Sequence, residues 1–100
     1  MNFEWDPKKA EMNLKKHGVA FEIAAYVFAD LQNVTLYDSG HSSHREIRWI
    51  TMGRVKEDVV VVVHTFPNEP DDSVIRIISA RLATREEEAY YIGGGEHGNG

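Results

Sequence analysis

The chain has 100 residues, of which 42% are hydrophobic and 27% are charged, and this fits one globular domain with a single core. The formal net charge of −5 argues against a simple nucleic-acid binder, and no apolar run approaches the ~20 residues that a membrane-spanning helix needs. The absence of cysteine excludes disulfides and thiolate metal sites. The N-terminus is polar and acidic where a secretory signal would be basic and apolar, so we expect a cytoplasmic protein without a membrane segment.

The first third of the sequence predicts two helices. Asp6 and Pro7 are typical of an N-cap and a first helical residue, and the helix that they begin runs to about Lys16, where Gly18 ends it. A second helix is predicted over residues 21–29 from its apolar stripe. The residues before Asp6 are expected to form only a short extended lead-in.

The middle of the chain predicts strands joined by short connections. Strands are expected over residues 33–37 and 45–53, and the valine-rich run at 59–65 is expected at the centre of the sheet. The loops are too short for crossover helices, so successive strands should be antiparallel neighbours. With a last strand from residue 74, the predicted fold is α+β: two N-terminal helices, a four-stranded antiparallel sheet and a C-terminal helix. This domain should cover residues 1–92, and the glycine-rich residues 93–100 should form a disordered tail.

The last strand carries arginines that a buried strand does not need. Arg76 interrupts an apolar β-branched run, so it requires a partner or a function, and a salt bridge to a sheet carboxylate such as Glu46 is the structural explanation. Because side chains alternate along a strand, Arg76 and Arg81 should lie on opposite faces unless a bulge near Ser79 reorients one of them. Thr84, with a glutamate three residues later, forms a capping box that starts the last helix.

The residue types favour phosphate chemistry over other reactions. His41 and His44 have the spacing of some zinc ligands, but they lie in a predicted loop without a thiolate nearby, so we expect no metal and no cofactor. The sequence has neither a G-x-S-x-G turn nor a glycine-rich phosphate loop. What remains is a set of cations and tyrosines, and arginine and lysine stabilise the charge that grows on a phosphoryl group.

Several separate motifs also resemble one family. The segments WDPKKAEMNLKKHGVAFEIAAYVFAD, HxxxxEIRWITMG and IRIISARLATREE resemble the BrnT family of ribonuclease toxins in type II toxin–antitoxin modules, over about residues 5–91. The resemblance implies a RelE-like fold and an endoribonuclease that inhibits translation. It also implies a cognate, BrnA-like antitoxin that forms a heterotetramer with the toxin and binds operator DNA.

Together, the cationic residues and the resemblance give a candidate site for RNA cleavage. His17 is the candidate for proton transfer, because histidine titrates near neutral pH. The candidate catalytic residues are Lys16, His17, Arg48, Arg76 and Arg81, and the candidate RNA-binding residues are Trp49, Arg85, Tyr90 and Tyr91.

The sequence leaves a second hypothesis open. Glu86 and Glu88 stand in the last helix where family members usually have basic residues, and Ala20 replaces their usual polar cap. These acids and the negative net charge also fit a binding module with little catalysis, which would act as antitoxin partner and co-repressor.

Overall fold

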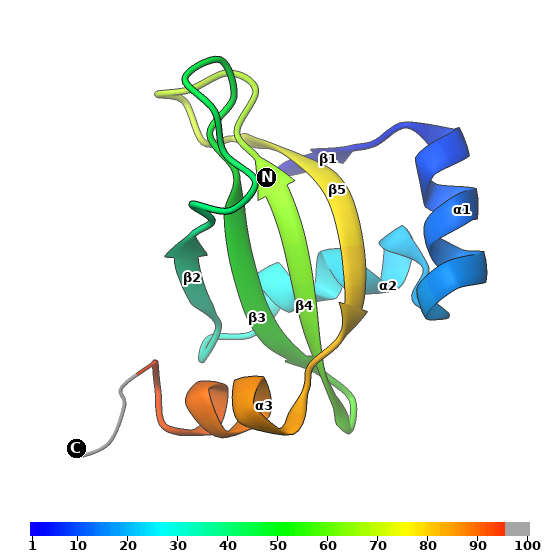
Figure 1. Cartoon of the computed structure of the whole chain (residues 1–100), viewed down its shortest axis with the longest axis vertical. Helices are drawn as coiled ribbons and strands as arrows, with labels where there is room; N and C mark the ends of the chain where they lie inside the picture. Colours follow the sequence, from blue (N-terminus) through cyan, green and yellow to red (C-terminus); the bar gives the residue numbers. More distant parts are fainter. Residues whose placement is uncertain (96–100) are drawn as a thin grey trace.

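The computed structural model describes residues 1–95, which form a twisted sheet with helices on both faces and along one edge (Figure 1). The helical elements are α1 (Pro7–His17), α2 (Phe21–Ala24), the 3-10 helix η1 (Ala25–Ala29) and α3 (Arg85–Ile92). The strands are β1 (Asn2–Glu4), β2 (Val34–Tyr37), β3 (Trp49–Val55), β4 (Asp58–Thr65) and β5 (Val74–Leu82). The helix caps match their sequence signals: Asp6 accepts a hydrogen bond from the Lys8 amide, and Gly18 ends α1 in the left-handed conformation.

The predicted sheet was wrong in its strand number and its pairing. The sheet has five strands in the order β1-β5-β4-β3-β2, and β1 pairs with β5 in parallel, so the sheet is mixed. The extra strand is the lead-in, in which Phe3 lies beside Ile75 and packs its ring against Phe28. Burying this aromatic side chain holds three residues against an edge that would otherwise stay unpaired. The combination of helices with a sheet was predicted correctly.

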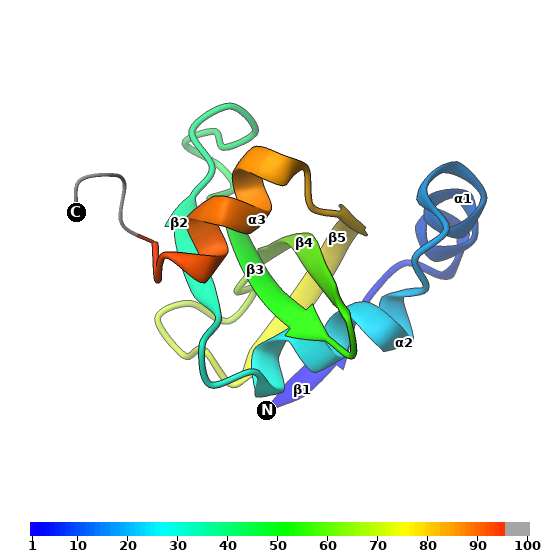
Figure 2. The ribbon, with the colours of Figure 1, turned by 90° about the horizontal axis from the view of Figure 1, so that it is seen from below.

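Two hydrophobic clusters fill the two faces of the sheet. The α2 and η1 helices cover one face, where Phe21, Val27 and Val62 are fully buried, and α3 crosses the other face over Met52 and Val61 (Figure 2). The approach of η1 to β3 is close: a Cβ atom at Gly53 would lie 2.8 Å from the carbonyl oxygen of Val27. Any larger residue at that position would push η1 away from the sheet.

A bulge in β5 changes which side chains share a face. Val63 pairs with Ser79 and His64 pairs with Ile77, so Ile78 is an extra residue on β5. Ile77 and Ala80 consequently both pack into the α2 face, although simple alternation would place them on opposite faces.

The α1 helix covers the edge of β5 beyond the reach of β1. The side-chain amide of Asn13 donates to the Ala80 carbonyl at 2.8 Å and accepts from the Ala80 amide at 3.1 Å, as a neighbouring strand would. Its nitrogen also donates to the Val19 carbonyl at 2.9 Å, which holds the connection to α2. At the C-terminus, residues 93–95 of the predicted tail form a turn after α3, and residues 96–100 lie outside the described part of the chain.

Candidate functional site

Three arginines lie on the α3 side of the sheet. Arg76 pairs with Thr65 and Arg81 pairs with Val61, and both follow residues that pack into the α2 face. The bulge at Ile78 places them together, since it reverses the alternation between the two positions. Arg48 precedes Trp49 of β3, and alternation places it on the same side. The sequence left the arrangement of Arg76 and Arg81 open, and the bulge decides it.

The first of these arginines, Arg76, forms an ion pair across the two edge strands. Its Nη2 lies 2.7 Å from Oε2 of Glu4, the residue beside it in the parallel register. The side chains are 46% and 41% exposed, so water screens their attraction and the pair is worth ~0–1 kcal/mol. The predicted partner, Glu46, is instead bound to Arg48, with 2.9 Å between Nε and Oε1.

Arg81 is held more firmly than the other two arginines. Its two terminal nitrogens lie 2.7 and 2.8 Å from the two carboxylate oxygens of Glu87, which is a bidentate pair. Glu87 also accepts a hydrogen bond from the Thr84 amide and thereby completes the capping box of α3. The hydrogen bonds from Arg81 lower the pKa of Glu87 to about 2, and the carboxylate in turn raises the pKa of Arg81. Arg81 therefore fastens α3 to the end of β5.

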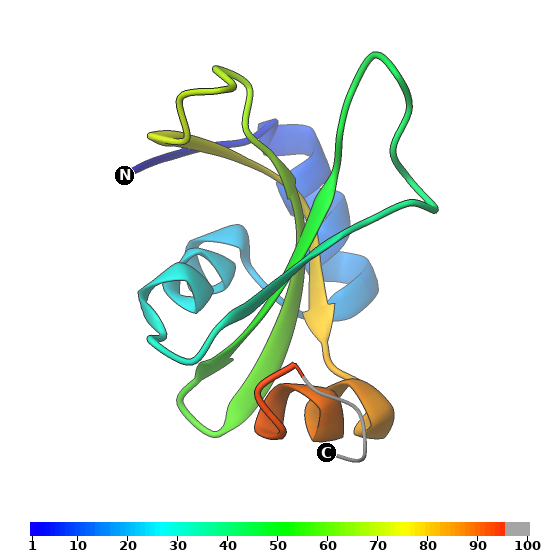
Figure 3. The same cartoon turned by 90° about the vertical axis from the view of Figure 1, so that its left-hand side faces the viewer.

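A polar hollow of ≈ 440 Å³ opens beside Arg76, between the loops that join β2 to β3 and β4 to β5. These loops lie at the same end of the sheet (Figure 3). Arg45 and Glu46 line the hollow from the first loop, Glu69 lines it from the second, and the buried Thr65 and Arg76 lie at the strand ends. The hollow therefore contains two guanidinium groups, which suits an anionic ligand.

Lys16 and His17 do not join this group. They end α1, and the neighbouring Gly18 lines a separate hollow with Val60 and Leu82. Leu82 is six residues along β5 from Arg76, which corresponds to roughly 20 Å at ~3.3 Å per residue. The structure therefore separates the candidate proton-transfer residue from the hollow beside Arg76.

The predicted RNA-binding residues also separate. The ring of Tyr91 is buried in the α3 cluster, and its hydroxyl donates to Asp30, while burial and this hydrogen bond raise the pKa of Tyr91. Tyr90 is half-buried and lines a shallow hollow with Glu86, and Arg85 is exposed at the start of α3. Trp49 packs edge-on against Tyr37 and Phe66 on the α2 face, so it lies on the opposite side of the sheet from the arginines.

The histidines expected to be poor metal ligands have other environments. His41 lies 2.8 Å from the buried carboxylate of Asp38, and His44 lines the hollow beside Arg76. His64 is fully buried, with Nε2 2.7 Å from the Thr51 hydroxyl, and burial lowers its pKa to about 4. Within residues 1–95, no three histidine, aspartate or glutamate side chains are placed to hold a metal ion together.

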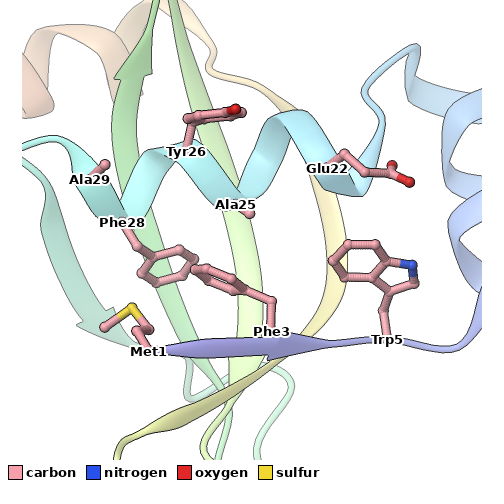
Figure 4. A pocket seen from close by; sticks show the side chains of 8 residues that line it. All are labelled: Met1, Phe3, Trp5, Glu22, Ala25, Tyr26, Phe28 and Ala29. Atoms are coloured by element: carbon pink, nitrogen blue, oxygen red, sulfur yellow. The ribbon is translucent and has the colours of Figure 1, made fainter.

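A second hollow, of ≈ 530 Å³, lies on the α2 face between β1 and the helices above it (Figure 4). Phe3, Trp5 and Phe28 point into it, and the exposed side chains of Met1 and Tyr26 stand at its rim. It offers apolar surface and, apart from Glu22, no charged group. Its chemistry suits a protein partner better than a phosphate.

Sequence analysis missed Glu4, Arg45 and His44 as members of the charged site. Glu4 alternates with Phe3 and Trp5, and this pattern would have predicted a strand that places Glu4 on a sheet face. Arg45 and His44 lie in an irregular loop, where no periodicity indicates the direction of a side chain.

The fold and the site together define a class: a small α+β protein that presents arginines on one sheet face and an apolar hollow on the other. Residues 5–87 match the family described as "Ribonuclease toxin, BrnT, of type II toxin-antitoxin system", and the chain belongs to this family. A type II toxin acts together with an antitoxin, so family membership also implies a partner protein. Among curated proteins, no significant match was found. No helix in residues 1–95 combines the length and apolar character needed to cross a membrane.

Proposed function

We propose that this protein is a metal-independent endoribonuclease that inhibits translation by cleaving RNA in the cytoplasm. The observation that carries the proposal is the placement of Arg48, Arg76 and Arg81 on one sheet face. Guanidinium groups bind phosphodiesters and stabilise their transition states, and family membership supports RNA as the substrate. In this reaction the RNA 2′-hydroxyl attacks the adjacent phosphorus, and the 5′-oxygen of the next nucleotide leaves.

The carboxylates assign different roles to the arginines. A phosphate would replace Glu4 on Arg76 easily, because that ion pair is nearly half exposed. Arg48 is more covered, with 27% of its side chain exposed, and it can contribute once Glu46 moves. Arg81 would hold α3 in position beneath the RNA, since the bidentate pair occupies it. Arg85 and the half-buried Tyr90 would then contact RNA beyond the scissile phosphate, and Lys16 and His17 would contact it only at the far end of β5.

We also propose that a BrnA-like antitoxin covers this face in a two-plus-two complex and carries the segment that binds operator DNA. Carboxylates on such an inhibitor could occupy the arginines as Glu4 and Glu46 do within the chain. Family membership supports the existence of the partner.

One observation favours the second candidate function, a binding module without appreciable catalysis. Arg48, Arg76 and Arg81 are each already paired with a carboxylate, and Glu86 and Glu88 add negative charge to α3. These acids would weaken RNA binding, and the protein would then act as a co-repressor with the antitoxin.

Cleavage of RNA by purified protein, together with growth after induction, tests the proposal. We expect wild-type protein to cleave RNA in excess EDTA, and Arg76→Ala to lower the cleavage rate by ~10²–10³, as loss of a transition-state donor does. Lys9→Ala removes an exposed charge from α1 and should leave the rate unchanged. Soluble wild-type protein that neither cleaves RNA nor slows growth, but binds the antitoxin, would establish the binding module instead.

A further inference from the structure

We propose that His44 transfers the proton in RNA cleavage and that Arg45 binds the scissile phosphate together with Arg76. This inference rests on the proposed ribonuclease function and assigns residues to its centre. It places the reaction in the hollow between the β2–β3 and β4–β5 loops.

The hollow brings together the groups that this reaction requires. His44 and Arg45 approach from one loop and Arg76 from the start of β5, within a concavity of ≈ 440 Å³. That volume is in the range of ligand pockets, so it can admit a nucleotide with its phosphate. An imidazole between two guanidinium groups gives one proton acceptor and two phosphate ligands, and no other hollow found in residues 1–95 combines these groups.

The other histidines in residues 1–95 are less suited to this role. His17 lies at the far end of β5, as its neighbour Gly18 shows by lining a hollow with Leu82. His41 is bound to Asp38, and His64 is fully buried among aromatic rings. His44 alone of the four is exposed and lines the same hollow as two arginines.

The chemistry balances with His44 as the base. Neutral His44 accepts the proton of the 2′-hydroxyl while the 2′-oxygen forms a bond to phosphorus. The bond from phosphorus to the 5′-oxygen breaks, and that oxygen takes a proton from water. The products are a 2′,3′-cyclic phosphate and a 5′-hydroxyl, and the imidazolium returns its proton to the solvent. Arg45 and Arg76 balance the charge that builds on the phosphoryl oxygens.

The charged groups that face His44 determine its pH behaviour. Arg45 and Arg76 favour the neutral imidazole that a base requires, whereas Glu46 and Glu69 favour the imidazolium. Binding of RNA adds a phosphate to this set. The cleavage rate should therefore fall at acidic pH, where the imidazole is protonated and cannot accept the 2′ proton.

Single-turnover cleavage at saturating RNA tests the assignment. We expect His44→Gln to lower the rate by ~10²–10⁴, to keep RNA affinity within a few-fold and to lose the acidic limb of the pH profile. His17→Gln should keep both the rate and the limb. Arg45→Ala should weaken RNA binding while the protein keeps the wild-type melting temperature.

Chemical rescue separates catalysis from folding. Added imidazole should restore part of the rate of His44→Ala, because the small molecule can occupy the space that the side chain leaves. A His44→Gln protein with the wild-type rate and pH profile would overturn the assignment, as would loss of rate without rescue. Wild-type protein that never cleaves RNA would instead refute the underlying ribonuclease function, and this is measured before any variant.

Discussion

The ion pair between Glu4 and Arg76 is the point at which a single residue controls access to the site. Glu4 occupies the guanidinium that a phosphate would bind, and both side chains are accessible to solvent. Because an exposed pair is worth ~0–1 kcal/mol, RNA can displace the carboxylate at small cost. Glu4 thus lowers RNA affinity without blocking the site.

Removal of this carboxylate should strengthen RNA binding. We expect Glu4→Gln to tighten binding by up to about fivefold, the equivalent of ~1 kcal/mol, and to change the free energy of unfolding by less than that amount. Glu11→Gln, which removes an exposed charge from α1, is the matched control. Equilibrium binding to a short RNA measures the effect. Equal gains in both variants would indicate a general effect of net charge instead of release of Arg76.

Glu87 gives a pH dependence of stability whose sign follows from its pKa. Folding lowers the pKa of this carboxyl from 4.5 to about 2, because Arg81 donates hydrogen bonds to the ionised form. The stabilisation is therefore complete above pH 4.5 and is lost as the pH falls toward 2. Since the pair is partly exposed and screened, we expect about 1–2 kcal/mol. Glu87→Gln should lose this amount at pH 7 and show a flatter dependence between pH 4.5 and 2 in denaturant melts. A variant as pH-dependent as the wild type would contradict the assignment.

At the scale of whole elements, the sequence predicts what local chemistry determines. The caps of α1 and α3 depend on neighbouring residues, and both are present as predicted. The bulge at Ile78 depends on how β4 and β5 pair, and no residue in β5 marks it. β1 has three residues, fewer than a reliable alternation pattern needs, and its pairing with β5 joins residues about seventy positions apart. The two features that bring Glu4, Arg76 and Arg81 to one face are therefore tertiary.

Asn13 is the element-scale contact whose loss should cost the most. Its amide makes three hydrogen bonds to the main chain of Val19 and Ala80, and it is buried. Asn13→Ala would leave these buried groups unpaired, so we expect a loss of about 2–4 kcal/mol in the free energy of unfolding. Met12→Ala, at the neighbouring exposed position, should cost less than about 0.5 kcal/mol. Urea melts of both variants measure the difference. Similar values would mean that water replaces the amide.

The whole molecule presents two different surfaces to its surroundings. One face carries the paired arginines and the hollow of mixed charge, and the opposite face carries the apolar hollow beneath η1. An RNA and a protein partner could in principle use separate faces. Inhibition by direct occlusion, however, requires the partner to reach the arginines.

The position of the antitoxin is therefore a prediction about these faces. We expect charge reversal at Arg48 or Arg76 to weaken the complex at least about tenfold and to slow association, because opposite charges steer the encounter. The association rate of wild-type protein should fall as salt rises, since salt screens exposed charges. Lys56→Glu reverses a charge in the turn between β3 and β4, at the other end of the sheet, and should change affinity less than about twofold. Tyr26→Ala tests the apolar hollow in the same binding measurements. If Tyr26→Ala weakens the complex while the arginine variants do not, the antitoxin binds the α2 face and must inhibit without covering the arginines.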